Sequence, residues 1–277
     1  MAEILSGERI AKEILQQLKT EITPNTLGIS VVQVGKNAVS DVYIQKKKKE
    51  AEGLGIRFFL YHFPETIAQK ELQYGLEKIL ESSRTGGMII QLPLPSHLPM
   101  QEILDLIPPS RDIDVLSSEA FGRFVLGNSS ILPPTVAAVQ SLLETYSIEV
   151  RGKHVVIVGA GRLVGLPLSI WFMQQKATVT IANRSTKNLA EITKQADILI
   201  SGVGSAGLIT GEMVKEGVVI IDAGTSVESG ETTGDVDFES VEPKASFITP
   251  VPGGVGPLTV AHLFSNLFIL PQAGGDE

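Results

Sequence analysis

The sequence KHVVIVGAGRLVGLPLSI at residues 153–170 decides the fold of this chain. Its apolar run VVIV predicts a buried strand, and residues 163–175 predict the helix that follows. Between them, Gly159, Gly161 and Gly165 form G-x-G-x-x-x-G, one residue longer than the commonest dinucleotide fingerprint. Glycines in such a turn let a pyrophosphate lie against a helix N-terminus, although a plain glycine-rich turn can look the same. The stretch therefore favours a nucleotide-binding strand–turn–helix unit.

Further apolar runs continue this pattern towards the C-terminus. They alternate with helical or turn-rich segments, as expected of a parallel sheet that is covered on both faces. We therefore predict an α/β fold with a doubly wound, Rossmann-type sheet in this half of the chain. The runs are ATVTIAN (177–183), ADILISGVG (196–204), GVVIIDAG (217–224) and ASFITPVPGG (245–254), with a helix expected over 186–195.

The tetrapeptide NRST at residues 183–186 bears on the choice of a nicotinamide cofactor. It stands where an acidic residue would bind the ribose 2′-hydroxyl of NAD, and it contains no acid. Arg184 could instead pair with the 2′-phosphate of NADP and stack on its adenine. We predict NADP over NAD from this position, against the alternative that Arg184 is an ordinary surface residue.

The N-terminal half also alternates helix and strand, which predicts a second α/β domain. Apolar residues recur at helical spacing over 4–20 and over 65–82. Ser40 could cap a helix that runs to about Ala51, with Gly53 just past its end. Strands are expected at 27–34, at 57–63 and within GMIIQLPLP (87–95).

The segment NSSILPP at residues 128–134 marks the expected domain boundary. Its two prolines suit the start of a helix that connects two domains. We expect a substrate domain over 1–132 and a nucleotide domain over 133–256. The residues 257–277 would contain a helix that returns to the first domain.

The composition excludes several classes of protein. A net charge of −8 argues against a general nucleic-acid binder, which needs a basic face. With no cysteine, the chain has no disulfide framework and no thiolate metal site, which fits a reducing cytoplasm. The N-terminus lacks the order of a signal peptide, and no apolar run approaches the ~20 residues of a membrane span. We expect a cytoplasmic protein that contacts no membrane and no nucleic acid, and we predict no metal ligand.

Tyr43 and Lys47 lie four residues apart on the helix expected from Ser40, so they share one face. A lysine whose pKa is lowered by burial can act as a general acid or base. Lysines occupy all of positions 46–49, however, and the simpler interpretation is a solvated basic face. Gln91, at a strand end, could complete a pocket.

The loop RDIDV offers two carboxylates for the same pocket, those of Asp112 and Asp114. Aspartate is also common in turns and at helix caps, so this loop alone does not establish a site.

These motifs together resemble the bifunctional methylenetetrahydrofolate dehydrogenase/cyclohydrolase family over nearly the whole chain. The most specific match is ITPVPGGVGPLTV (248–260). Other segments match in order and spacing: YIQKK (43–47), IIQLPLP (89–95), RDID (111–114), ADILISGVG (196–204) and VVIIDAG (218–224).

The resemblance implies a role for each matched residue. Lys47 matches the catalytic lysine of the Y-x-x-x-K motif, Gln91 the glutamine that tunes it, and Asp114 the aspartate that anchors the pterin. The folate would also contact Tyr43, which stacks near the pterin, Ile90, Leu92 and a closing loop of Pro252, Gly253, Gly254, Val255 and Gly256. The cofactor would contact Gly159, Ala160, Gly161, Arg162, Gly165, Arg184, Gly204 and Thr225.

The resemblance also implies two reactions in one-carbon metabolism that serve purine biosynthesis. NADP would take a hydride from 5,10-methylenetetrahydrofolate, and water would then open the methenyl ring to 10-formyltetrahydrofolate. The protein would be a homodimer whose partners are tetrahydrofolate derivatives.

The chain departs from the family pattern at several positions. Gly159-Ala160-Gly161 replaces Gly-Arg-Ser, so a common contact to the 2′-phosphate is missing. That contact could have moved to Arg184 or Arg162, or the enzyme could accept or prefer NAD. Val115 replaces a glycine after RDID, and because valine disfavours positive φ, we expect a different loop path. Val136-Ala137-Ala138 departs from the pattern at the domain junction.

Other functions stay open on the sequence alone. A monofunctional cyclohydrolase or an NAD-preferring dehydrogenase would keep Lys47 while changing the phosphate-binding turn. A shikimate-type dehydrogenase shares the two-domain plan but would not explain PVPGGVGP (250–257). A non-catalytic folate- or nucleotide-binding protein would not need Lys47, Gln91 and Asp114 together.

Overall fold

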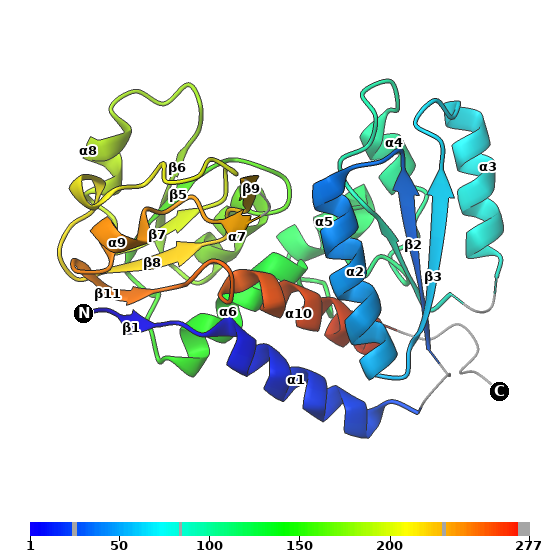
Figure 1. The fold of residues 1–277 in the computed structure, drawn as a ribbon, viewed down its shortest axis with the longest axis horizontal. Helices are drawn as coiled ribbons and strands as arrows, with labels where there is room; N and C mark the ends of the chain where they lie inside the picture. Colours follow the sequence, from blue (N-terminus) through cyan, green and yellow to red (C-terminus); the bar gives the residue numbers. More distant parts are fainter. Residues whose placement is uncertain (24–26, 83–84, 229–230, 271–277) are drawn as a thin grey trace. The chain divides into compact units, whose positions relative to one another are not determined.

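The computed structural model describes residues 1–23, 27–82, 85–228 and 231–270. The chain forms two compact units. Met1–Lys12 and Thr135–Thr259 make up the six-stranded unit, and Glu13–Pro134 with the residues from Val260 on make up the three-stranded unit. The predicted two-domain α/β fold is confirmed (Figure 1).

The six-stranded unit contains a fully parallel sheet in the order β1-β11-β8-β7-β5-β6. Strand β5 lies between β6, which is the next strand along the chain, and β7, which is the strand after that. This arrangement creates a topological switch point between β5 and β7, where parallel α/β sheets bind ligands at the carboxyl ends of the strands. The strands are β1 (Glu3–Ile4), β5 (His154–Val158), β6 (Thr178–Ala182), β7 (Ile198–Ser201), β8 (Val218–Asp222) and β11 (Ala245–Ile248).

Helices cover both faces of this sheet. One face packs through Val156, Leu199 and Ile220 against α8 (Leu189–Thr193) and α9 (Phe238–Val241). The other face meets α7 (Gly165–Gln174), which contacts β5 and β6. The connecting helix α6 (Pro134–Thr145) begins at Pro134, as the two prolines predicted. Because both faces are covered, the strands are continuous apolar runs, which is why the sequence revealed them.

The three-stranded unit has a parallel sheet in the order β3-β2-β4. Every residue of the central strand β2 (Gly28–Val34) is buried. One face packs against α3 (Gln69–Leu80) and α4 (Met100–Leu104) through side chains such as Val32, Leu76 and Ile103. The edge strands are β3 (Arg57–Phe63) and β4 (Gly87–Ile90), and the unit also contains the helices α2 (Ala38–Gly53) and α5 (Ser118–Val125).

The C-terminal helix α10 (Val255–Ile269) supplies the other side of this core. An added Cβ on Gly87 would lie 2.8 Å from Leu267 and from Ile113, so glycine permits the close packing of β4 on α10. Asn266 ties the helix to its surroundings by donating to the carbonyl oxygens of Ile113 and Leu132. The expected return of the last helix to the first domain is confirmed from Val260 on.

The N-terminus corrects two expectations. The apolar spacing over 4–20 predicts one helix, but Glu3 and Ile4 form β1, which pairs with β11, and helix α1 spans Gly7–Glu21. Because β1 extends the other sheet, Met1–Lys12 belong to the six-stranded unit and not to a domain of residues 1–132.

The cap of α2 is not Ser40, contrary to what the sequence suggested. Asn37 precedes the helix, and its side chain accepts a hydrogen bond from the backbone N–H of Ser40.

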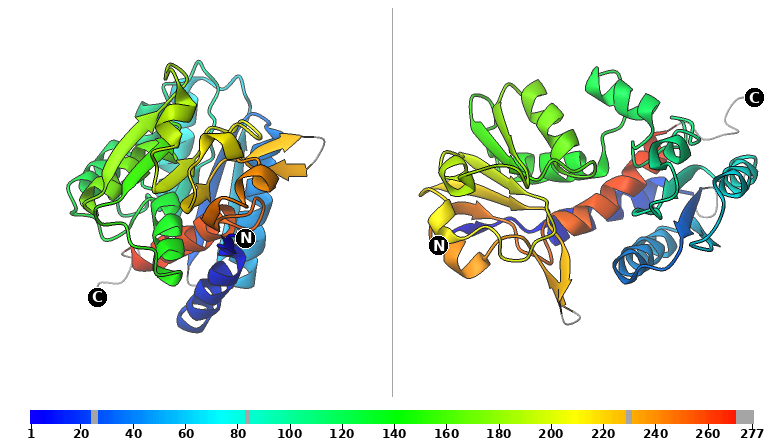
Figure 2. Two further views of the ribbon diagram at one scale, coloured as in Figure 1. Left: turned by 90° about the vertical axis from the view of Figure 1, so that its left-hand side faces the viewer. Right: turned by 90° about the horizontal axis from the view of Figure 1, so that it is seen from above.

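A two-stranded antiparallel hairpin, β9 (Ser226–Glu228) and β10 (Glu231–Thr233), was not predicted. It extends away from the six-stranded sheet (Figure 2).

None of the helices in the described part of the chain is long and apolar enough to cross a membrane. Nor do the described residues contain a group of three or more side chains suited to hold a metal ion.

Candidate active site

Lys47 lies on α2, whose first turn is fixed by the side chain of Asn37. Of the four consecutive lysines only Lys47 is partly buried, and the other three are exposed. Lys48 forms a surface ion pair with Glu52 at 3.9 Å. The helix therefore turns one lysine inward and leaves its neighbours in solvent.

The Lys47 ammonium donates to Oε1 of Gln91 over 3.0 Å. Gln91 directly follows β4, and its backbone N–H continues the sheet by donating to the carbonyl of Val32. Its Nε2 donates to the carbonyl oxygen of Leu92, which also accepts from the hydroxyl of Ser40 on α2. These bonds fix the amide with its oxygen towards the lysine. Sequence reasoning missed the part played by Ser40, which it treated as a cap.

Asp114 adds a negative charge to this pair. Burial lowers the pKa of Lys47 from its usual range, and the charge of Asp114 opposes the shift in part. Burial raises the pKa of Asp114, Lys47 lowers it, and the neighbouring Asp112 raises it further. Burial thus disfavours the charged form of both groups, and its lowered pKa makes the Lys47 ammonium a stronger acid than that of an ordinary lysine.

The loop that carries Asp114 is held by Asp112. Its Oδ2 accepts the backbone N–H groups of Leu116 and Ser117, at 3.0 and 2.7 Å, while its carbonyl accepts from Val115. Val115 has a φ of +57°, so this loop keeps a positive φ in spite of its valine. The expectation that valine would give the loop a different path by avoiding positive φ is wrong, because the bonds of Asp112 close the turn around it.

The other residues expected near a folate differ in how deeply their side chains are buried. Tyr43 is partly buried one turn before Lys47, with the ammonium of Lys46 5.6 Å from its ring centre. Leu92 is partly buried, and a cis peptide bond joins it to Pro93. The side chain of Ile90 is 2% exposed and belongs to the core, so it presents no exposed surface to a ligand.

The loop from Pro250 to Gly256 lies in the other compact unit. A cis peptide bond joins Val251 to Pro252, and Gly253 has a φ of +108°. The carbonyl of Gly253 accepts the first N–H groups of α1, from Gly7 and Glu8, at 2.9 and 3.1 Å. Val255 is buried, whereas a side chain added at Gly256 would meet open space. The loop is therefore anchored to the start of α1 and exposes backbone at its end.

The glycine turn after β5 fits a dinucleotide. Gly159 has a φ of +109°, and a Cβ on it would lie 2.7 Å from the carbonyl oxygen of Gly202. Gly165 begins α7, and a Cβ there would lie 1.7 Å from the carbonyl oxygen of Gly159. A Cβ at Gly161 would touch nothing, and Ala160 is exposed. Two glycines thus close the turn, and the open backbone between them suits a pyrophosphate.

Two arginines lie at the carboxyl ends of the neighbouring strands. Arg184 is exposed in the turn after β6, which is ordered because Ser185 donates to Asn183 Oδ1 and Asn183 donates to Thr186 Oγ1. Arg162 is partly buried in the glycine turn after β5. Both lie in turns at the end of the sheet that contains the switch point.

The turns after β7 and β8 complete this end of the sheet. Gly204 has a φ of +69°, and a Cβ on it would lie 3.6 Å from the carbonyl oxygen of Thr225. Beneath these turns lie the buried carboxylates of Asp222 and Asp235, which sequence reasoning missed. The motif GDVD (234–237) carried no recognised signal, because aspartates beside glycine usually indicate turns.

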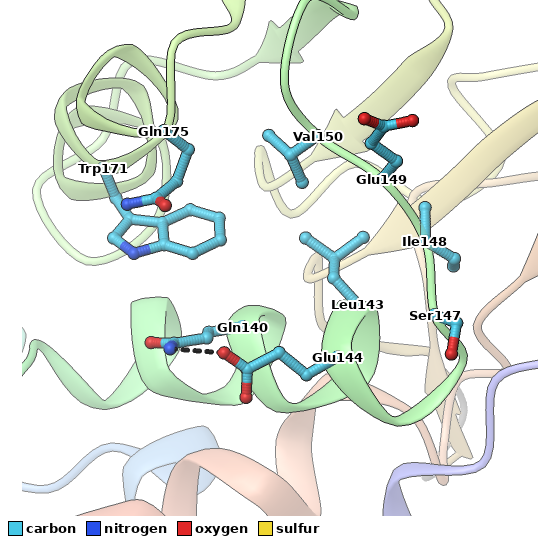
Figure 3. Close-up of a pocket in the computed structure, with 9 residues that line it drawn as sticks. All are labelled: Gln140, Leu143, Glu144, Ser147, Ile148, Glu149, Val150, Trp171 and Gln175. Atoms are coloured by element: carbon cyan, nitrogen blue, oxygen red, sulfur yellow. Dashed lines mark hydrogen bonds between the residues drawn. The ribbon is translucent and has the colours of Figure 1, made fainter.

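One further cavity, of about 290 Å³, lies away from all of these residues. It is formed by α6, α7 and the segment between α6 and β5, with Trp171, Leu143 and Ile148 among its lining residues (Figure 3). Within it the amide of Gln140 donates to Glu144 (Figure 3). None of the predicted site residues lines this cavity.

Known proteins resemble this chain over its whole length. "Bifunctional protein FolD 2" of Lactobacillus johnsonii is 43% identical and covers 98% of each chain. The crystal structure of bifunctional FolD, a methylenetetrahydrofolate dehydrogenase/cyclohydrolase from Campylobacter jejuni, is 38% identical, with a TM-score of 0.90 over 96% of this chain and 97% of that one. The Trypanosoma brucei enzyme, solved with NADP cofactor and an inhibitor, is 33% identical with a TM-score of 0.92 over 97% of each chain.

Two family models match as well. The one described as the tetrahydrofolate dehydrogenase/cyclohydrolase catalytic domain matches residues 5–114, and the one described as its NAD(P)-binding domain matches residues 133–273. Together with the relatives, these matches confirm the resemblance of the sequence motifs. The chain belongs to the tetrahydrofolate dehydrogenase/cyclohydrolase family.

Proposed function

We propose that this protein oxidises 5,10-methylenetetrahydrofolate to the methenyl compound with NADP and then hydrolyses that product to 10-formyltetrahydrofolate. The observation that carries the proposal is the Lys47–Gln91 hydrogen bond of 3.0 Å beside Asp114, at a lysine whose pKa burial lowers. A folate subsite on the three-stranded unit and a dinucleotide subsite on the six-stranded unit agree with the family membership.

Lys47 is the proton-transfer group for hydrolysis. Its neutral amine takes a proton from the water that attacks the methenyl carbon, and its ammonium then gives that proton to N5 as the C–N5 bond breaks. The hydroxyl proton left on the carbon is released to solvent as the formyl C=O bond forms. The positive charge of the methenyl substrate lowers the pKa of Lys47 further, which favours the neutral amine. Gln91 orients the amine without adding a charge that would restore its affinity for protons.

The other residues of the three-stranded unit hold the folate. Asp114 accepts hydrogen bonds from the polar edge of the pterin, and Tyr43 packs near its ring. Pro252, Gly253, Gly254, Val255 and Gly256 match the substrate loop of the family, and we expect them to contact the folate.

The six-stranded unit binds the dinucleotide. NADP accepts the hydride when it is bound. Gly159, Ala160, Gly161 and Gly165 admit its pyrophosphate against the start of α7, while Arg184 and Arg162 supply charge for the 2′-phosphate. Gly204 and Thr225 bind it from the turns after β7 and β8. This unit comprises Met1–Lys12 and Thr135–Thr259.

The protein acts as a homodimer in the cytoplasm, where its product supplies formyl groups for purine biosynthesis. The sheet edge at β6 and the adjoining helix expose Ile181 and Met173, which are 43% and 57% exposed and suit a partner copy. The absence of cysteine fits a reducing compartment.

One assay tests the proposed function. Methylenetetrahydrofolate is supplied with NADP or with NAD, and the methenyl and formyl products are followed separately. The proposal predicts both products, with a lower KM for NADP. Hydrolysis of added methenyl substrate without any oxidation would instead indicate a monofunctional cyclohydrolase, and a lower KM for NAD would refute the assigned cofactor.

A further inference from the structure

Two buried carboxylates lie under the turns that end β7 and β8. Asp235 is 0% exposed and Asp222 is 2% exposed. Burial and the charge of Asp235 both raise the pKa of Asp222, to about 6, in spite of the hydrogen bonds that it accepts. Two buried acids side by side are costly for a fold, so their presence here calls for a reason beyond stability.

Asp235 determines the path of the chain after β7. Its Oδ2 accepts the hydroxyl of Ser201 at 2.8 Å and the backbone N–H of Val203 at 2.7 Å, and its Oδ1 accepts the N–H of Ser205 at 2.8 Å. The two backbone donors lie on either side of Gly204. The carboxylate therefore fixes the turn at which Gly204 adopts its positive φ.

Asp222 does the same for the neighbouring turn. Its Oδ1 accepts from Gly224 and its Oδ2 from Val236, each at 2.9 Å. The two turns interlock through glycines: a Cβ on Gly224 would lie 2.0 Å from the carboxyl carbon of Asp235, and one on Gly234 would lie 2.1 Å from Asp222 Oδ2. Each carboxylate fills the space that a side chain would occupy, so the two turns pack directly against each other.

We propose that Asp235, supported by Asp222, is a positioning residue for the dinucleotide, because it holds the turns of Gly204 and Thr225 in the shape that binds the cofactor. The inference rests on the proposed assignment of Gly204 and Thr225 to the NADP site. It predicts that loss of the clamp weakens NADP binding and leaves the chemistry at Lys47 intact.

The test compares Asp235→Asn and Ser201→Ala with the parent enzyme as the full chain. An amide has one acceptor oxygen, so an asparagine side chain at this position cannot accept from Val203 and Ser205 at once, whereas Ser201→Ala removes a single bond. Asp237→Asn makes the same chemical change two residues on, where the side chain makes no cap hydrogen bond, and serves as the control. Calorimetric titration gives the dissociation constant of NADP, and hydrolysis of methenyltetrahydrofolate without NADP reports on the other subsite.

We expect the dissociation constant to rise about tenfold in Asp235→Asn and about threefold in Ser201→Ala. The KM for NADP should rise in parallel, while hydrolysis and the control stay within about twofold of the parent. Unchanged affinity in Asp235→Asn overturns the inference. If Asp235→Asn loses hydrolysis as well, the result for Ser201→Ala is used instead. Unchanged NADP affinity in Ser201→Ala then overturns the inference. A parent enzyme that binds no NADP would overturn the proposed function itself, and the inference with it.

Discussion

At the scale of single residues, Val115 shows how a functional loop can override local preference. Its φ of +57° is unfavourable for a β-branched residue, yet the Asp112 carboxylate closes the turn by accepting the backbone N–H groups of Leu116 and Ser117. The turn places Asp114 beside Lys47, as their mutual pKa effects indicate. A strained residue next to a carboxylate that is proposed to bind substrate agrees with the clustering of backbone strain at active sites.

Comparing the stabilities of glycine and alanine variants at position 115 isolates the backbone strain of the positive φ. Val115→Gly should be more stable than Val115→Ala by about 1 kcal/mol, because both leave a similar cavity but only glycine tolerates the positive φ. Val139 is equally buried but lies in helix α6, so there the alanine variant should be more stable than the glycine variant by about 1 kcal/mol. Denaturant unfolding of the four variants measures both differences. Equal stability of the two variants at position 115 would contradict the strain.

A single residue, Arg184, carries the proposed preference for NADP over NAD. Arg184 stands exposed in an ordered turn after β6, where no acid is present to bind a ribose hydroxyl. Arg184→Ala should raise the KM for NADP about tenfold or more and leave that for NAD within about twofold, because only NADP carries the 2′-phosphate. Arg151→Ala, another exposed arginine of the same unit, serves as the control. An unchanged ratio of the two KM values would remove Arg184 from the site.

At the scale of elements, helix α2 presents the lysine and is fixed at its start by one cap. Asn37→Ala removes the acceptor for the N–H of Ser40 and should lower the free energy of unfolding by about 1 kcal/mol. Hydrolysis should change little, because Lys47 lies nearly three turns further along the helix. Denaturant unfolding and the hydrolysis assay check both parts. Unchanged stability in Asn37→Ala would show that the cap has been assigned wrongly.

The elements also show what a sequence can predict. Buried parallel strands such as β5 and β8 are continuous apolar runs, and the sequence revealed them with nearly correct ends. The strand β1 is too short for any periodicity and follows directly into an amphipathic helix, so it was missed. The hairpin of β9 and β10 lies outside the core and left no apolar pattern either. Strand pairings between distant segments cannot be read from local propensity.

The candidate site was predictable to a similar degree. Motif resemblance indicated Lys47, Gln91 and Asp114, and the structure shows Lys47 bonded to Gln91 and electrostatically coupled to Asp114. The supporting roles of Ser40 and Asp235 depend on partners 52 and 30 or more residues away, which spacing does not reveal. Local patterns identify side chains that carry chemistry, whereas the groups that position them emerge only from the folded chain.

At the scale of the whole molecule, the buried acid pair makes stability depend on pH. The pKa of Asp222 is raised to about 6 from 3.8, so the folded chain keeps this proton where the unfolded chain loses it. Its contribution is complete below about pH 4 and is lost as the pH rises through about 6. Relative to Asp222→Asn, the parent should therefore lose roughly 3 kcal/mol of unfolding free energy across this window. Denaturant unfolding at several pH values measures it, and a constant difference would contradict the raised pKa.

The central claim concerns Lys47, and its most direct test is the rate of methenyltetrahydrofolate hydrolysis in Lys47→Met. The matched control is Lys46→Met, since that neighbouring lysine is exposed. We predict that Lys47→Met lowers hydrolysis by at least about a hundredfold, because a positioned proton-transfer group contributes that much or more. Lys46→Met should stay within about twofold of the parent. A Lys47→Met enzyme that hydrolyses the methenyl substrate at the parent rate would contradict the assignment.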